Sequence, residues 1–168
     1  MIVILGVDPG LTGALAWLTY CPDSKIINLL GVMDVPTVKV KVGKSLRAVP
    51  VPALLRDTFA NPIFPKPNTV VIEQVHAMPG QGVTSMFNFG HIAGMLAGVA
   101  AGLGLPLAYL RSNEWQVLSG VRKGTNDAGR LRASGLFPGQ AHMFHRVKDH
   151  NRADAVLIGY AFIKKEFP

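Results

Sequence analysis

Apolar residues occur along the N-terminal part of the chain in short runs separated by turn-forming residues. A continuous run at 2–7 and mainly apolar runs at 14–20 and 26–33 are joined by short segments that contain aspartate with glycine or proline. Runs of this length between turn signals predict strands, and three in succession predict an antiparallel meander. We therefore expect the chain to begin with three neighbouring strands of one sheet.

The next segments predict a parallel strand that is reached through a helix. Pro52 suits the first turn of a helix, and the apolar stripe within 54–59 continues that helix, which ends before Pro62. The β-branched run at 69–75 then predicts a strand. Because a helix connects the two, this strand is expected to lie parallel to the first one and beside it.

The second half of the chain is predicted to be mainly helical. Thr84 or Ser85 can cap a helix that runs to about Leu103, and residues 106–111 predict a fifth strand. Further helices are expected at 113–118, 127–134 and 152–165. Without a repeat or a long linker, residues 1–168 predict one α/β domain with a five-stranded mixed sheet flanked by helices.

An uncharged stretch at 92–110 is long enough to cross a membrane, but it contains Gly104 and Pro106. These two residues divide it into a helix and a short strand, so no membrane span is expected. The apolar start of the chain is too short for a signal peptide, and Cys21 has no partner cysteine in the chain. Both observations indicate a reducing, cytoplasmic compartment.

The composition is that of a folded protein with an excess of positive charge. Apolar residues make up 49% of the chain and charged residues 16%, which excludes a disordered chain. The 17 Lys and Arg residues outnumber the 10 Asp and Glu residues, and the formal net charge is +7. This excess favours a polyanionic partner, above all nucleic acid, although it could serve only to solvate the surface.

The few acidic residues include two at the ends of apolar strands. Asp8 ends the first predicted strand and precedes a glycine turn, and Glu73 lies near the end of the parallel strand. Parallel neighbouring strands would bring both carboxylates to one edge of the sheet, where they could share a hard cation such as Mg²⁺. The alternative is that each carboxylate simply ends a strand and is solvated.

A third acid lies on the last helix. Asp154 precedes a run of apolar residues that must pack on the sheet, so its carboxylate is carried toward the core. A carboxylate held there needs a metal ion or a basic neighbour. His150 and Asn151, four and three positions earlier, share its face of a helix, whereas Asp149 does so only if the helix begins after it.

These residues stand in motifs that resemble those of a known family. The segment Val7-Asp8-Pro9-Gly10-Leu11-Thr12-Gly13 resembles the opening motif of the RuvC-type Holliday-junction resolvases of the ribonuclease H-like superfamily. Further blocks match in the same order: Ile72-Glu73, 77–82 with 85–90 as in the phage-type branch, Trp115, 136–138 and 149–155. The resemblance spans nearly the whole chain.

The resemblance implies a ribonuclease H-like fold and a metal-dependent, structure-selective endonuclease. Such an enzyme resolves four-way (Holliday) DNA junctions by paired phosphodiester cleavage. The resemblance further implies a homodimer with two Mg²⁺ ions in each active site, replaceable by Mn²⁺, in the cytoplasm of a bacterial or phage-infected cell. Branched DNA is the expected partner.

The resemblance also implies roles for the acids. The catalytic metal ligands of the family match three acids directly: Asp8, Glu73 and Asp154. Bacterial members place the fourth ligand where this chain has Asn151, so we assign that role to Asp149, which restores a fourth carboxylate. His150 is the alternative, as a ligand or as a general base.

Basic residues gather in two segments that could contact DNA phosphates. The first segment holds Lys39, Lys41, Lys44 and Arg47, and the second holds Arg122 and Lys123. Lys39 and Lys41 share one face of an expected strand. The alternative for this pair is an edge strand that lysine protects from aggregation.

The helix expected after residue 83 carries two further features. Phe87 follows a glycine-rich loop, and the resemblance implies base stacking at the junction for Phe87 or Phe89, with core packing as the alternative. Glycines recur every four residues at Gly90, Gly94, Gly98 and Gly102. Because each costs about 1 kcal/mol relative to alanine, we expect close approach to another helix, of this chain or of a second subunit.

Two other functions are weighed against the nuclease. The turn after Asp8 also resembles the phosphate-binding turn of actin-like and sugar-kinase ATPases, but those enzymes hold nucleotide between two domains and this chain predicts one. A noncatalytic junction-binding or nucleic-acid-binding module would show a replaced acid, and all three matching acids are present.

Overall fold

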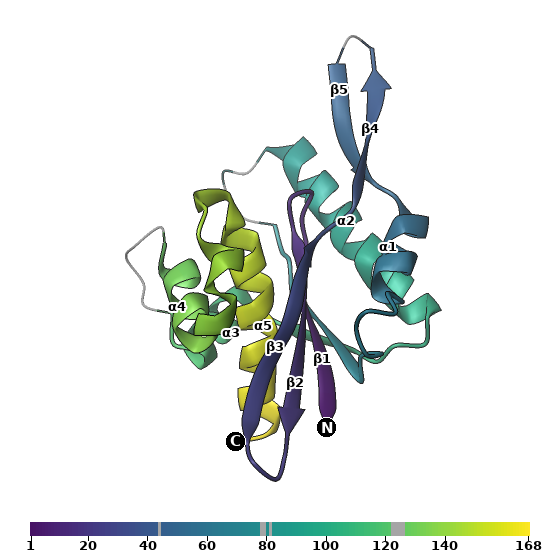
Figure 1. The fold of residues 1–168 in the computed structure, drawn as a ribbon. Coiled ribbons are helices and arrows are strands. Elements are labelled where there is room, and N and C mark those ends of the chain that lie inside the picture. The colour runs from purple at the N-terminus through teal and green to yellow at the C-terminus, as the bar shows by residue number, and fades with distance from the viewer. Residues whose placement is uncertain (44, 78–79, 81, 122–126) are drawn as a thin grey trace.

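The computed structural model describes residues 1–43, 45–77, 80, 82–121 and 127–168. Five strands form a mixed sheet in the order β3-β2-β1-β6-β7 (Figure 1). They are β1 (Ile2–Asp8), β2 (Ala14–Cys21), β3 (Ile26–Asp34), β6 (Thr69–Glu73) and β7 (Leu107–Leu110). Strands β1, β2 and β3 pair antiparallel, whereas β6 is parallel to β1 and β7. The predicted meander, the parallel strand beside β1 and the last strand are confirmed.

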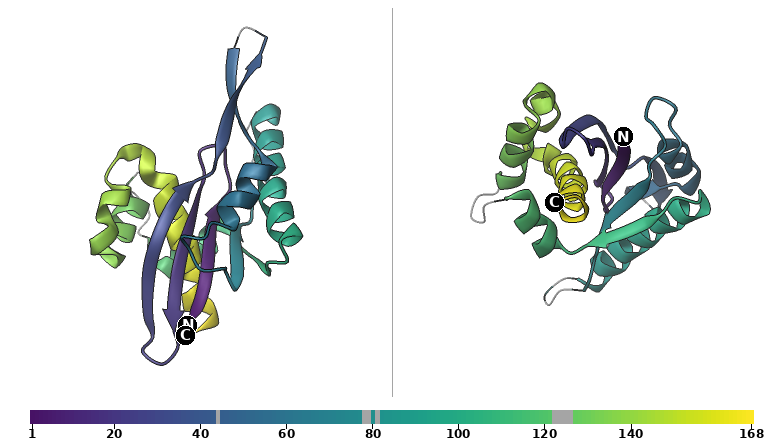
Figure 2. Two further views of the ribbon diagram at one scale, coloured as in Figure 1. Left: turned by 45° about the vertical axis from the view of Figure 1, so that its right-hand side comes forward. Right: turned by 90° about the horizontal axis from the view of Figure 1, so that it is seen from below.

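Helices cover both faces of this sheet (Figure 2). One face packs against α1 (Pro52–Phe59) and α2 (Val83–Gly102), and the other carries α3 (Ser112–Ser119), α4 (Ala128–Leu136) and α5 (His150–Glu166). Two 3₁₀ turns, η1 (Pro138–Phe144) and η2 (Val147–Asp149), lead into α5. The expected cap of α2 at Thr84 or Ser85 is wrong, because α2 begins directly after Gly82 and no side chain caps it.

Alternation along β1 divides its apolar side chains between two cores. Leu5 and Val7 pack with α1 and α2, whereas Ile4 packs with α5. Because successive side chains point to opposite faces of a strand, Asp8 shares the α5 face with Ile4. The last carboxylate of β1 is therefore directed toward the helix that carries Asp154.

Helix α5 approaches β1 through a contact between the two backbones. A Cβ on Gly6 would overlap the carbonyl oxygen of Ala155, and a Cβ on Gly159 would lie 2.6 Å from Leu18 Cδ1. Glycine at both positions lets the helix lie directly on the strand. Asp154, the residue before Ala155, is thereby brought close to the end of β1.

The strand expected around Lys39 is one half of a hairpin that projects from the rest of the fold (Figure 1). The hairpin consists of β4 (Thr37–Val42) and β5 (Ser45–Pro50). Its register pairs Arg47 with Val40, which lies between Lys39 and Lys41 on β4. Since directly opposed residues share a face, the two lysines share one face as predicted, and Arg47 lies on the other.

The uncharged stretch at 92–110 is divided as expected, because α2 ends at Gly102 and β7 begins at Leu107. Gly104 adopts a positive φ of 66° in the turn between them. Within the described residues, α2 is long and apolar enough to cross a membrane by length and composition. This is weak evidence, since core helices of soluble proteins can meet the same criterion.

Candidate active site

Two of the predicted acids lie side by side at one edge of the sheet. β1 and β6 are parallel neighbours, and their register pairs Val7 with Ile72, the residues just before Asp8 and Glu73. Glu73 has the same parity on β6 as Val71, which packs in the α5 core. Both carboxylates therefore stand at the carboxyl ends of their strands on the α5 face, as the sequence predicts.

Asp154 of α5 completes a group of three mutually repelling acids. Burial raises the pKa of Asp8 well above its ordinary value, and the charges of Asp154 and Glu73 raise it further. Burial, followed by the charge of Glu73, raises the pKa of Asp154 to about 6, while His150 acts in the opposite direction. We refer to Asp8, Glu73 and Asp154 as the acidic cluster.

Two side chains that sequence reasoning did not assign to the site hold Glu73 in place. The Ser112 hydroxyl donates a hydrogen bond to Glu73 Oε1, and the Trp115 indole Nε1 donates to the same oxygen at 3.1 Å. Both donors belong to α3, which begins two residues after β7, the third parallel strand to end at this edge. That position is the signal that could have identified Ser112. Trp115 is buried, as expected, and it also orients an acid.

The structure does not bring Asp149, our choice for the fourth ligand, into the acidic cluster. Its side chain is 2% exposed and accepts hydrogen bonds from the Arg146 backbone at 3.0 Å and from the Arg146 guanidinium at 2.8 Å. These hydrogen bonds, above all that from the guanidinium, lower the pKa of Asp149 to about 2. Arg152 Nη1 lies 3.8 Å from Asp149 Oδ1 and binds Asp34 as well. This ion-paired network occupies the Asp149 carboxylate in the turn directly before α5.

His150 and Asn151 lie in the first turn of α5, on the approach to Asp154. The charge of His150 lowers the pKa of Asp154, which places the imidazole within electrostatic reach of the cluster. Asn151 Nδ2 donates to the backbone oxygen of Thr12 at 2.7 Å and to its hydroxyl at 2.8 Å. Asn151 thus ties α5 to the turn after Asp8, and His150 becomes the better candidate for the fourth ligand.

Helix α4 lies against the acidic cluster at Gly129. A Cβ on Gly129 would lie 2.8 Å from Asp154 Oδ1, closer than real Cβ atoms come to other groups. Only glycine lets α4 come this close without pushing the Asp154 carboxylate aside. Gly129 is therefore a positioning residue of the site.

The donor set of the acidic cluster fits a hard divalent cation. Within the described residues, no three His, Cys, Asp or Glu side chains lie close enough together to enclose a metal ion. Repulsion among the carboxylates opposes closer approach, and Ser112 and Trp115 hold one oxygen of Glu73. Carboxylate oxygens are nevertheless the ligands that Mg²⁺ and Mn²⁺ prefer, and a bound cation would offset the repulsion that raises the two pKa values.

The residues expected to contact DNA are found in several places. Lys39, Lys41 and Arg47 are exposed on the hairpin. Phe87 is 74% exposed and stacks on His91 with ring centroids 6.5 Å apart, so core packing does not explain it. The expected phosphate contacts Lys44, Arg122 and Lys123 lie outside the described residues. The neighbouring Arg132 is engaged inside the fold, where its Nε donates to the Ser119 backbone oxygen at 2.6 Å.

The glycine stripe of α2 faces away from the rest of the chain. A Cβ at Gly90, Gly94, Gly98 or Gly102 would meet no atom of the described residues within 4 Å. The buried residues of α2, Ile92, Leu96 and Ala100, are offset from these glycines by two positions and so lie on the opposite side of the helix. One of our two expectations was that a helix of the same chain packs against the glycine stripe. Among the described residues, no helix does so.

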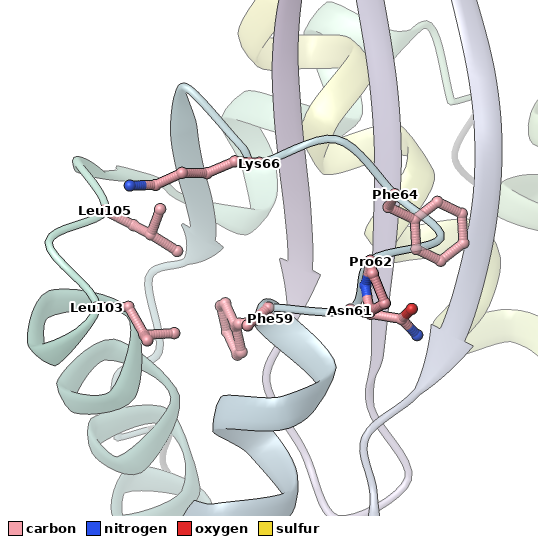
Figure 3. A pocket seen from close by; sticks show the side chains of 8 residues that line it. Phe59, Asn61, Pro62, Phe64, Lys66, Leu103 and Leu105 are labelled. Atoms are coloured by element: carbon pink, nitrogen blue, oxygen red, sulfur yellow. The ribbon is translucent and has the colours of Figure 1, made fainter.

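A mainly apolar pocket of about 320 Å³ lies away from the acids (Figure 3). It is lined by Phe59, Ala60, Asn61, Pro62, Phe64, Lys66, Leu103 and Leu105. Leu105 and Lys66 precede β7 and β6, so the pocket lies at the amino ends of these two strands, whereas the cluster lies at the opposite edge of the sheet. It is not part of the candidate active site.

Comparisons with known proteins show the fold. No family model matches the chain, and no curated protein matches it by sequence. RuvC of Thermus thermophilus, in complex with a Holliday junction substrate, matches with a TM-score of 0.70 at 16% identity, over 98% of this chain and 95% of that chain. The fowlpox virus Holliday junction resolvase matches with a TM-score of 0.59 at 15% identity, over 98% and 99% of the two chains.

The sheet order, the helices on both faces and these matches agree. The expected α/β architecture with a five-stranded mixed sheet is confirmed. The chain has the ribonuclease H-like fold of the RuvC-type resolvases.

Proposed function

We propose that this protein is a metal-dependent, structure-selective endonuclease that resolves four-way DNA junctions by paired phosphodiester cleavage. The observation that carries the proposal is the acidic cluster, formed by three carboxylates from β1, β6 and α5 at one edge of the sheet. Its surroundings and the net charge of +7 suit a polyanionic substrate. Solved structures of the same fold include a RuvC bound to a Holliday junction substrate.

Asp8, Glu73 and Asp154 would hold two Mg²⁺ ions, with His150 as the fourth ligand or as a general base. When bound, the two ions would lower the pKa of an attacking water and stabilise the leaving 3′ oxygen. Ser112 and Trp115 keep one oxygen of Glu73 occupied, which fixes the direction of the other. Because the pKa of Asp154 is raised to about 6, protons compete with cations for this ligand near pH 6 and below, and the raised pKa of Asp8 acts in the same direction.

Basic and aromatic side chains around the cluster would bind the junction. Lys39 and Lys41 project on one face of the hairpin and would contact phosphates, as would Lys44, Arg122 and Lys123. Phe87, exposed at the start of α2, would stack on a base at the junction centre and replace the stacking lost when a base pair opens. Affinity should therefore fall steeply with salt, with a log-log slope of about −0.9 for each phosphate neutralised on duplex arms.

The exposed face of α2 would form a homodimer, so that two clusters serve one two-fold symmetric junction. Only 17% of the residues in the most apolar stretch of α2 are buried. Its glycine stripe leaves space for the backbone of a partner helix. Gly94→Leu should separate the subunits, because the bulky side chain is introduced twice at a symmetric contact. Sedimentation tests this: a persistent dimer would place the dimer surface elsewhere.

The nuclease proposal is tested with synthetic four-way, forked and linear duplex DNA in the presence of Mg²⁺. We expect paired symmetric incisions in the four-way junction, no cleavage of the linear duplex, and no cleavage of any substrate with EDTA. The matched control is Asp8→Asn, which removes a metal ligand and should still bind the junction. A wild-type protein that binds the junction but leaves it intact at every Mg²⁺ and Mn²⁺ concentration would contradict the proposal.

A further inference from the structure

A groove separates the hairpin from the first turns of α2, outside the acidic cluster. Its volume is about 550 Å³. It is lined by Leu11, Arg47, Ala48, Val49, Pro50, Thr84, Asn88, His91 and Ile92. Of these residues only Arg47 is among the expected phosphate contacts, and that role does not account for the other side chains of the lining.

The groove is formed by a strand edge on one side and a helix face on the other. Four consecutive residues of β5, from Arg47 to Pro50, line it, and successive side chains of a strand alternate between faces. The edge of β5 that does not pair with β4 therefore borders the groove. On α2, Thr84, Asn88 and His91 follow one another at intervals of four and three, so they share one side of the helix.

The chemistry of the lining suits a nucleobase. Leu11, Val49 and the buried Ile92 supply apolar surface that can contact the face of a flat ring. Arg47 and Asn88 are both exposed, and each has a planar group that can form two parallel hydrogen bonds. Arginine pairs in this way with guanine, and asparagine or glutamine with adenine, so both side chains recognise the edge of a purine.

The groove adjoins the candidate active site. Leu11 stands three residues after Asp8, in the turn that joins β1 to β2. The first turns of α2 lie against this turn, since a Cβ on Gly10 would be 3.8 Å from the Phe89 ring. His91, which lines the groove, carries the exposed Phe87 ring stacked on it with an interplanar angle of 11°. A strand that runs past the acidic cluster could thus place a neighbouring base in the groove.

We propose that this groove binds an unstacked purine of the DNA strand next to the scissile phosphate, and that it gives the protein a base preference. This inference rests on the proposed function, because it needs a junction whose central bases can leave their stack. Bases at an exchange point require less energy to unstack than bases within a duplex, since the continuous stack of the duplex is already broken there. Arg47 then reads a base edge, whereas Lys39 and Lys41, on the opposite face of the hairpin, contact phosphates.

The test uses four-way junctions that differ only in the bases at the exchange point, and it measures their equilibrium binding to the Asp8→Asn protein. Junctions with a purine at one such position should bind about tenfold more tightly than those with a pyrimidine there. Arg47→Ala and Asn88→Ala, each combined with Asp8→Asn, should bring this ratio close to one. Lys39→Ala is the matched control from the same hairpin: it should weaken binding to every junction and leave the ratio unchanged.

The same measurement shows which idea fails. A ratio near one for the Asp8→Asn protein, or a ratio that survives in both groove variants, overturns the base-binding groove. Cleavage by the wild-type protein with no base preference leaves the nuclease intact and removes the groove. A base preference in binding without wild-type cleavage supports the groove and contradicts the nuclease proposal. Because Arg47 and Asn88 are exposed, equal melting temperatures serve to confirm that the variants are folded.

Discussion

Two carboxylates at the start of α5, only five residues apart, have opposite surroundings. Asp149 is paired by Arg146 and approached by Arg152, and its pKa falls to about 2. Asp154 faces other acids, and burial together with Glu73 raises its pKa to about 6. Burial alone therefore does not identify a reactive acid. An acid that is paired with a basic side chain of the same protein stabilises the fold. An acid that faces other acids requires a cation from solution.

The largest expected effect comes from removing one charge of the acidic cluster. Asp8→Asn takes away a metal ligand, and we expect cleavage of a four-way junction to fall at least about a hundredfold, because metal ions supply several kcal/mol of transition-state stabilisation. Junction binding should persist. Asp23→Asn, which changes an exposed acid, is the control and should cut normally. Wild-type turnover by Asp8→Asn would remove Asp8 from the metal site.

The same substitution should make the metal-free protein more stable at neutral pH. Because the folded pKa values of Asp8 and Asp154 are above their unfolded values, ionising these acids costs stability. The cost grows as pH rises from about 4, and for Asp154 it is fully present above its folded pKa of about 6. Asp8→Asn removes one buried charge and its repulsion, so the free energy of unfolding at pH 7 should rise. At pH 4 the gain should largely disappear.

The second comparison sets His150 against Asp149. His150→Ala should lower cleavage by about tenfold or more if the imidazole supplies the fourth ligand or the general base. Asp149→Asn should leave the chemistry of a correctly folded protein nearly intact, because its carboxylate is held by Arg146. Rates measured side by side in saturating Mg²⁺ decide between them. Equal losses would return Asp149 to the site, and a harmless His150→Ala would exclude His150.

A smaller effect is expected from crowding the acidic cluster without changing its charge. Gly129→Ala puts a methyl group 2.8 Å from Asp154 Oδ1, so the carboxylate must turn away. We expect about a tenfold loss in metal affinity, read as a weaker rise of the melting temperature with Mn²⁺. Gly135→Ala is the matched control in α4, because its Cβ would meet no described atom within 4 Å. If Gly129→Ala responded to Mn²⁺ like the wild type, α4 would have no positioning role.

Strand patterns predict the edge of the sheet well, because a buried parallel strand and its last residue are local features. Asp8 and Glu73 end such strands, and each lies where its strand order and parity require. The glycine contact of α5 with β1 depends on packing between distant segments, and no local pattern predicts it. The orienting role of Ser112 likewise depends on where the third parallel strand ends.

Helix geometry alone does not predict that Asp149 stays outside the acidic cluster. The condition for it to share the face of Asp154 is met, since α5 begins at His150, directly after it. The carboxylate of Asp149 instead accepts hydrogen bonds from the backbone N–H and the guanidinium of Arg146, three residues earlier. A metal ion would have to compete with this charged pair for the carboxylate. Of the hairpin, the sequence predicts only the strand that contains Lys39 and Lys41. Alternating valine and lysine indicate a strand, but they do not identify the segment with which it pairs.

The last expected effect concerns the stability of the fold and not the chemistry, and it has the opposite sign to that of Asp8→Asn. Because the folded pKa of Asp149, about 2, lies below its unfolded value, the ion pair stabilises the fold above pH 4, and this contribution is lost as pH falls toward 2. A shift of this size, reduced for the solvent around the 43% exposed Arg146, corresponds to about 1–2 kcal/mol. Asp149→Asn should therefore lower the free energy of unfolding at pH 7 by that amount, and denaturant melts should show the difference shrinking as pH drops below 4. Asp57→Asn, which breaks a pair with Arg56 on the open surface, is the control and should change stability by less than about 0.5 kcal/mol. If Asp149→Asn instead stabilised the protein at pH 7, as Asp8→Asn should, Asp149 would belong with the repelling acids and the contrast between the two groups would be lost.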